Sequence, residues 1–151
     1  MEKAKEMFRD LSEPHRRAIR ATLIRLDRAC TLFEQLAGGF EIRSELYELR
    51  NTLSSETREK LGGEVSELKR TLTELRGRFG FERKTDDATH LIQTLCSFQW
   101  EGLSELKSPH LRQYGALPPE FGEILDRSME TLIERIGRIS GLMRHADVPG
   151  E

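Results

Sequence analysis

Apolar residues recur at spacings of three and four along most of this chain, which is the period of one face of an α-helix. The most regular run lies between Pro118 and about His145 and comprises Leu125, Met129, Leu132, Ile136, Ile139 and Met143. A second run with the same 4-3-4-3-4 spacing comprises Ile19, Leu23, Leu26, Cys30, Phe33 and Ala37. Both runs are typical of helices with coiled-coil-like packing, and we expect these two helices to form the scaffold of the fold.

Residues that commonly start and end helices flank the second of these runs. Ser12 can cap its start, with Pro14 in the first turn, and Gly38-Gly39 can end it. Residues 1–11 form a short amphipathic segment that would be unstable alone, so we expect it to dock on the bundle through Phe8.

The stretch from Phe40 to Arg78 is harder to divide. Two helical stripes occur in it, Ile42-Leu46-Leu49-Leu53 and a longer one from Leu61 to Phe79. Gly62-Gly63 would cost a helix interior about 2 kcal/mol relative to alanines. A single helix over the whole stretch would be roughly 58 Å long. One long helix is therefore an alternative, but we favour two helices broken between Ser54 and Gly63.

The next segments read as a connector and a further helix. Gly77 to Lys84 is predicted to be a connector with Phe79 and Phe81 turned inward. Thr85 would cap a helix with two aspartates in its first turn, and Ser108-Pro109 would end it. We expect residues 146–151 to form a flexible tail.

Composition supports an all-α fold in one domain. The 151 residues are 33% charged and only 7% aromatic, and they predict an antiparallel four- or five-helix bundle over residues 1–151 with a short N-terminal helix. The net charge of −2 gives no attraction of the whole molecule to nucleic acid or to an anionic membrane. Cys30 and Cys96 suit buried free thiols in a reducing compartment. With no apolar run long enough to span a bilayer and no signal-peptide pattern, we expect a cytoplasmic protein.

One pair of residues invites comparison with an enzyme class. Arg83 and His90 form an Arg-x6-His pair at a helix entry. The pair resembles the Arg-x(4–6)-His motif of helical nucleases of the higher-eukaryote and prokaryote nucleotide-binding (HEPN) class, although Lys84 follows the arginine where those proteins often place a polar residue. The resemblance implies an RNA-cleaving domain in which His90 handles the proton of a ribose 2′-hydroxyl and Arg83 holds the phosphate.

A basic cluster opens the helix that follows Ser12. Arg16, Arg17 and Arg20 lie in its first turns, where positive charge opposes the helix dipole. They predict anion or nucleic-acid binding, or else arginines in solvent that pair with Glu13 or other segments. Because no aromatic residues interleave with them, a platform for single-stranded nucleic acid is not favoured.

No pattern predicts a metal or a cofactor. The four histidines lie on separate segments, and the two cysteines are far apart in the sequence. Trp100 and Tyr114 are candidates for an interface between chains. The leading hypothesis is a non-catalytic cytoplasmic helical interaction module that forms a homo-oligomer or binds a protein partner, with the HEPN-like enzyme and the anion-binding protein as alternatives.

Overall fold

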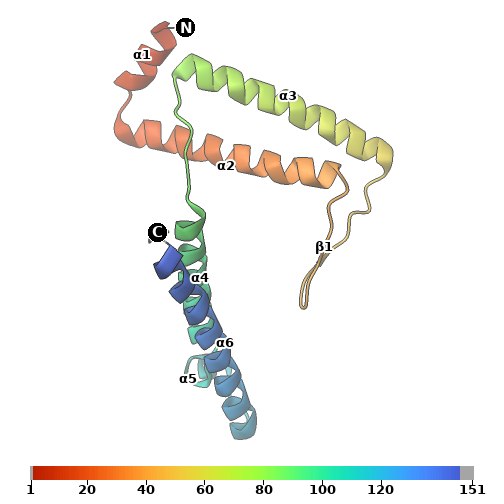
Figure 1. Cartoon of the computed structure of the whole chain (residues 1–151), viewed down its shortest axis with the longest axis vertical. Coiled ribbons are helices and arrows are strands. Elements are labelled where there is room, and N and C mark those ends of the chain that lie inside the picture. Colours follow the sequence, from red (N-terminus) through yellow and green to blue (C-terminus); the bar gives the residue numbers. More distant parts are fainter. Residues whose placement is uncertain (1, 147–151) are drawn as a thin grey trace. The chain divides into compact units, whose positions relative to one another are not determined.

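The computed structural model describes residues 2–146, which are mainly helical (Figure 1). The elements in chain order are α1 (Glu2–Asp10), α2 (Glu13–Ala37), β1 (Ile42–Arg43), β2 (Glu48–Leu49), α3 (Ser55–Phe79), α4 (Ala88–Glu105), α5 (Ser108–Leu111), the 3-10 turn η1 (Arg112–Tyr114) and α6 (Pro119–Ala146). The all-α fold is confirmed, with helix pairs packed as in a helical bundle.

The chain divides into two compact units, Met1–Lys84 and Thr85–Glu151, which we call the first and second units. The prediction of one domain over residues 1–151 stays a prediction. Of the expected flexible tail, residues 147–151 lie outside the described residues, whereas Ala146 is the last residue of α6.

The first unit is built on α2 and α3, which run antiparallel and pack along their length (Figure 1). Cys30 of α2 is completely buried and Val65 of α3 is 3% exposed. An ion pair also joins the two helices, with Lys69 Nζ 2.7 Å from Glu34 Oε1. The stripes predicted for these helices therefore do form the interface between them, although Ile19 and Phe33 at the edge remain partly exposed.

The predicted ends of α2 are confirmed by their geometry. The hydroxyl oxygen of Ser12 accepts a hydrogen bond from the backbone N–H of His15 at 3.4 Å, which satisfies one of the free donors of the first turn. After the last turn, Gly39 takes a φ of +88°, a left-handed conformation that glycine adopts without a steric cost. The chain then leaves the helix.

The predicted helix over residues 40–53 is wrong. This segment is a short antiparallel hairpin in which Ile42 pairs with Leu49. Asn51 holds its base, because its side-chain Nδ2 donates to the carbonyl oxygen of Leu36 at 2.7 Å and its backbone N–H donates to Glu41 Oε1 at 3.2 Å. These contacts fix the loop and need an extended chain, which a helical spacing of leucines cannot reveal.

The predicted break between Ser54 and Gly63 is also wrong, because α3 runs unbroken from Ser55 to Phe79. Ser54 caps it by accepting the N–H of Thr57 at 3.1 Å. A Cβ added at Gly62 would lie 3.9 Å from the Cβ of Ala37, so the glycine lies where α2 comes close. Packing against α2 thus outweighs the low helix propensity of the two glycines.

Helix α1 docks on the end of α3, as predicted. The ring of Phe8 lies edge-on to Phe81 with centroids 4.8 Å apart, and Phe79 lies 6.0 Å from Phe8. This three-ring cluster confirms that Phe79 and Phe81 turn inward. The connector begins later than predicted, at Gly80, which has a φ of +71° and ends α3.

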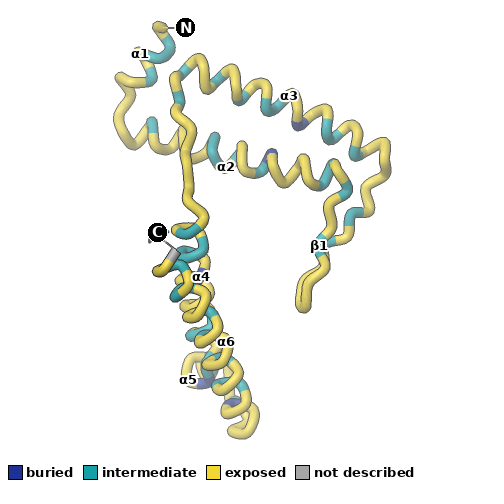
Figure 2. The backbone as a smooth tube through the Cα atoms, in the orientation of Figure 1, coloured by how far each residue is buried: buried dark blue, intermediate teal, exposed yellow. Residues whose placement is uncertain are grey.

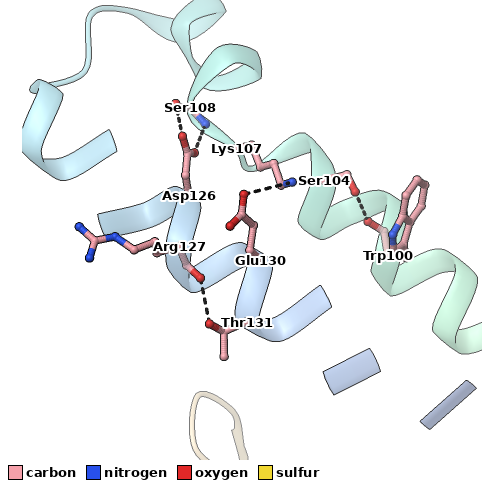
Figure 3. Close-up of polar contacts among 8 residues, drawn as sticks. All are labelled: Trp100, Ser104, Lys107, Ser108, Asp126, Arg127, Glu130 and Thr131. Atoms are coloured by element: carbon pink, nitrogen blue, oxygen red, sulfur yellow. Dashed lines mark hydrogen bonds and ion pairs between the residues drawn. The ribbon is translucent and has the colours of Figure 1, made fainter. Parts of the chain in front are cut away.

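The second unit is an antiparallel pair of α4 and α6 with the short α5 between them (Figure 1). Asp87, and not Thr85, caps α4, because Asp87 Oδ2 accepts the N–H of Thr89 at 2.9 Å. Ser108-Pro109 starts α5 after α4 has already ended at Glu105. The Asp126 carboxylate of α6 binds Ser108 and so ties α5 to α6 (Figure 3).

Candidate functional site

Helix α6 carries two adjacent apolar stripes, and only one of them packs on α4. The half-buried stripe includes Met129, Ile133, Ile136 and Met143. Leu132 and Ile139, which the sequence pattern assigned to the packed face, are instead 46% and 43% exposed. That part of the prediction is wrong. The reason is that Leu132 and Ile133 are adjacent apolar residues, so two apolar stripes run side by side about 100° apart around the helix, and the spacing alone does not show which one packs on α4.

Helix α4 has the same arrangement. Ile92, Cys96 and Leu103 are buried or half-buried in the unit. Leu91, Leu95 and Phe98 follow each other at spacings of four and three and are all exposed. Figure 2 shows exposed and intermediate positions alternating along α4 and α6. The wide apolar arc predicted for this helix is therefore present, but α6 covers only part of it.

The two exposed stripes lie on the same side of the α4–α6 pair. On both helices an exposed residue immediately precedes a packed one, as Leu95 precedes Cys96 and Leu132 precedes Ile133. One residue corresponds to a rotation of about 100° around the helix axis. Because the helices are antiparallel and face each other, an approximate two-fold axis relates them. On each helix the exposed stripe is rotated by the same angle from the packed stripe. Both exposed stripes therefore lie on the same face of the pair.

We call this surface the association face. It consists of Leu91, Leu95, Phe98 and Leu106 on α4 and of Phe121, Ile124, Leu132, Ile139 and Leu142 on α6, all of them exposed. On α6 two polar residues interrupt this face. They are Ser128 and Arg135, which lie fourteen and seven residues before Leu142 and therefore on the same side of the helix. A continuous apolar surface of this kind marks a site of association more often than scattered exposed leucines do.

The two predicted interface residues lie elsewhere. Trp100 is 53% exposed, and it lies two residues beyond Phe98, which places it about 160° away around α4 and off the association face. Tyr114 is 81% exposed in the turn η1. A role for either in an interface stays a prediction.

The proposed nuclease pair is split between the two units. Arg83 is an exposed residue of the connector in the first unit, and His90 is an exposed residue in the first turn of α4 in the second unit. Neither unit contains both residues, so the HEPN-like reading stays a prediction. Within residues 2–146, no group of three or more His, Cys, Asp and Glu side chains could hold a metal ion.

The first unit has a groove of about 790 Å³ between α1, α2 and the end of α3. We call it the basic groove. Its cationic lining consists of Lys5, Arg9, Arg16, Arg17, Arg20, Arg25, Arg28 and Lys84, and its carboxylate is Glu13. The structure thus brings together the three arginines predicted from the sequence with five further cations. Those five were missed because they come from separate segments and form no local pattern.

Two of the three predicted arginines are held by the protein. Arg16 Nη1 donates to the carbonyl oxygen of Arg9 at 2.8 Å, which links α1 to α2. Arg17 Nη2 lies 2.9 Å from Glu13 Oε1, the pairing expected of an arginine in solvent. Within the described part of the chain, the side chains of Arg20 and Arg28 make no hydrogen bond or ion pair, so their guanidinium groups can bind another molecule.

Comparison of the chain with protein-family models, with curated proteins and with solved structures finds no match. Among the described residues, no helix is both long and apolar enough to cross a membrane.

Proposed function

We propose that this chain is a non-catalytic helical interaction module that self-associates through the association face. The observation that carries the proposal is the second apolar stripe on both α4 and α6, exposed on one side of the pair. In a two-helix pair each helix has one neighbour and buries one stripe. In a four-helix bundle each helix has two neighbours and buries two. A second copy of the α4–α6 pair would supply the missing neighbours.

The symmetry of the pair favours a second copy over an unrelated partner. A two-fold axis that lies in the plane of this face would bring the same surface of two chains together, as in most homodimers, and would pair the antiparallel helices of one chain with those of the other. Helix α6 has 28 residues and is therefore about 42 Å long, which gives a long zone of contact. Arg135 can extend its apolar stem over that zone while its charge stays in water.

A cytoplasmic location is part of the same proposal. Cys30 and Cys96 are both buried and unpaired. Free thiols of this kind suit a reducing compartment.

Light scattering on the full chain tests the proposal. The wild-type chain should have about twice the single-chain mass of 17.4 kDa at micromolar concentration. Phe98→Glu and Leu142→Glu should each shift the mass to that of one chain, because burying a carboxylate in an apolar contact is strongly unfavourable. Both side chains are 65% exposed in the single chain, so the helices themselves should survive.

Ser97→Glu is the matched control. Ser97 is the exposed neighbour of Phe98, and it points away from both the association face and α6. This variant adds the same charge and should keep the mass of the wild type. A wild-type chain that is monomeric at all concentrations, or a Phe98→Glu variant that associates like wild type, would refute self-association through this face.

A further inference from the structure

We infer that the basic groove binds single-stranded nucleic acid, with its arginines on the phosphates and its apolar floor under the bases. This function is separate from self-association, because the groove lies wholly within the first unit. The inference rests on the number of cations in the groove, their spacing along α2 and the aromatic rings that line the groove beside them.

The charge of the groove matches several phosphates. It gathers eight cationic side chains against the single carboxylate of Glu13, and that carboxylate is already paired with Arg17. Six of the eight cations are arginines, whose planar guanidinium groups bind phosphate oxygens in pairs. One small anion would engage only some of the six arginines. A chain of phosphates would engage them together.

The spacing of the arginines also suits a linear polyanion. Arg17 and Arg28 are eleven residues apart on α2, which corresponds to about 16 Å along the helix. Arg20 lies between them, and both it and Arg28 are without a partner among the described residues. The local charge contrasts with the chain as a whole. The first unit holds 18 basic and 15 acidic residues and the second holds 6 and 11.

The floor of the groove distinguishes a single strand from other polyanions. Phe8 and Phe79, which pack on Phe81 and stay partly exposed, line it beside the cations together with Ala21 and Ile24. Aromatic side chains stack on nucleic-acid bases of any sequence. A duplex keeps its bases stacked inside, and an acidic peptide has no comparable flat rings to offer. No aromatic residue interleaves with the arginines along α2, but the fold brings rings from α1 and α3 into the same groove.

Fluorescence anisotropy with the full chain tests this inference. The probes are fluorescein-labelled 12-nucleotide oligo(dU) and oligo(U), which differ only in the sugar, with an unlabelled 12-base-pair duplex and a polyglutamate peptide as competitors. Either single strand should bind, and the stronger of the two identifies the preferred sugar. The logarithm of the affinity should fall with the logarithm of salt concentration at a slope of about −0.7 for each phosphate contacted, so at least three contacts predict a slope steeper than about −2.

Arg20→Glu and Arg28→Glu should each lower the affinity about tenfold or more, whereas Arg20→Lys should keep most of it. Arg43→Glu on the β hairpin is the matched control, since Arg43 is exposed, lies outside the groove and changes the net charge equally. Circular dichroism checks that each variant is folded. The inference is overturned if neither strand binds, if the groove variants bind like Arg43→Glu, or if the duplex or polyglutamate competes as well as an unlabelled single strand.

Discussion

Asp126 accepts two hydrogen bonds from Ser108, one from its backbone N–H to Oδ1 and one from its hydroxyl to Oδ2, both at 2.7 Å (Figure 3). Ser108 is the first residue of α5 and is only 7% exposed. These two hydrogen bonds lower the pKa of the Asp126 carboxyl below its usual range. The backbone hydrogen bond is the larger cause, and the bond from the hydroxyl is the second. The carboxylate therefore fixes the turn between α4 and α6.

This contact makes the stability of the second unit depend on pH. A carboxyl whose pKa is lower in the folded state contributes stability above its unfolded pKa of about 3.9, and this contribution is lost as the pH falls through the folded pKa. Asp126→Asn should lower the melting temperature by a few degrees at pH 7, and the difference from wild type should shrink below about pH 4. Thermal circular dichroism of both proteins at pH 7 and below about pH 4 measures this difference in melting temperature.

Glu123→Gln provides the control for this effect. Glu123 is an exposed residue of the same helix, and its side chain makes no ion pair or hydrogen bond within residues 2–146. Its loss should change the melting temperature little at either pH. A deficit in Asp126→Asn that stays equal at pH 7 and at low pH would show that the charge of the carboxylate does not matter.

Two glycines of the first unit should respond to alanine in opposite directions. Gly39→Ala forces a φ of +88° on a residue with a Cβ, which would also lie 2.5 Å from Arg58 Nη1. It should destabilise the fold by about 1–2 kcal/mol, with the displaced arginine adding to the loss. Gly63→Ala meets nothing within 4 Å inside α3 and should stabilise the fold by about 0.5–1 kcal/mol.

Urea denaturation of the two variants measures both changes. The pair also tests the course of α3. If residues 54–63 formed a turn instead of a helix, alanine at Gly63 would bring no gain.

The sequence pattern predicted what depends on local periodicity. It located α2 and α6, because their stripes and end signals lie within each helix. It failed at residues 40–53, where each strand is only two residues long and too short to show alternation. Leu46 fits a helical spacing there, yet it is fully exposed at the hairpin tip, where the N–H of Ser44 donates to the carbonyl oxygen of Tyr47 at 2.8 Å.

The candidate sites depend on information that the pattern lacks. On α6, residues such as Leu132 and Ile133 are both apolar, so periodicity cannot say which one faces α4. In the groove, Arg16, Arg17 and Arg20 were found because they are close in sequence. The contributions of Lys5 and Lys84 required the tertiary fold.

Burial should protect the Cys30 thiol. Its side chain is 0% exposed, and burial is the main cause that raises its pKa, with Asp27 adding to the shift. In a Cys96→Ser variant, where Cys30 is the remaining thiol, iodoacetamide at pH 8 should react very slowly with the folded protein and quickly in urea, because the reactive species is the thiolate. Mass spectrometry follows the reaction. Rapid labelling without denaturant would mean that α2 and α3 separate readily.

The most direct test of self-association asks which chain covers the association face. A photoreactive phenylalanine analogue at position 95 is introduced into chains labelled with ¹⁴N or ¹⁵N, which are mixed, irradiated, digested and analysed by mass spectrometry. The account predicts cross-linked peptide pairs that combine both isotopes and join position 95 to α4 or α6 of another chain. Cross-links that stay within one isotope and join position 95 to residues 2–84 would contradict it, because the first unit of the same chain would then cover the face.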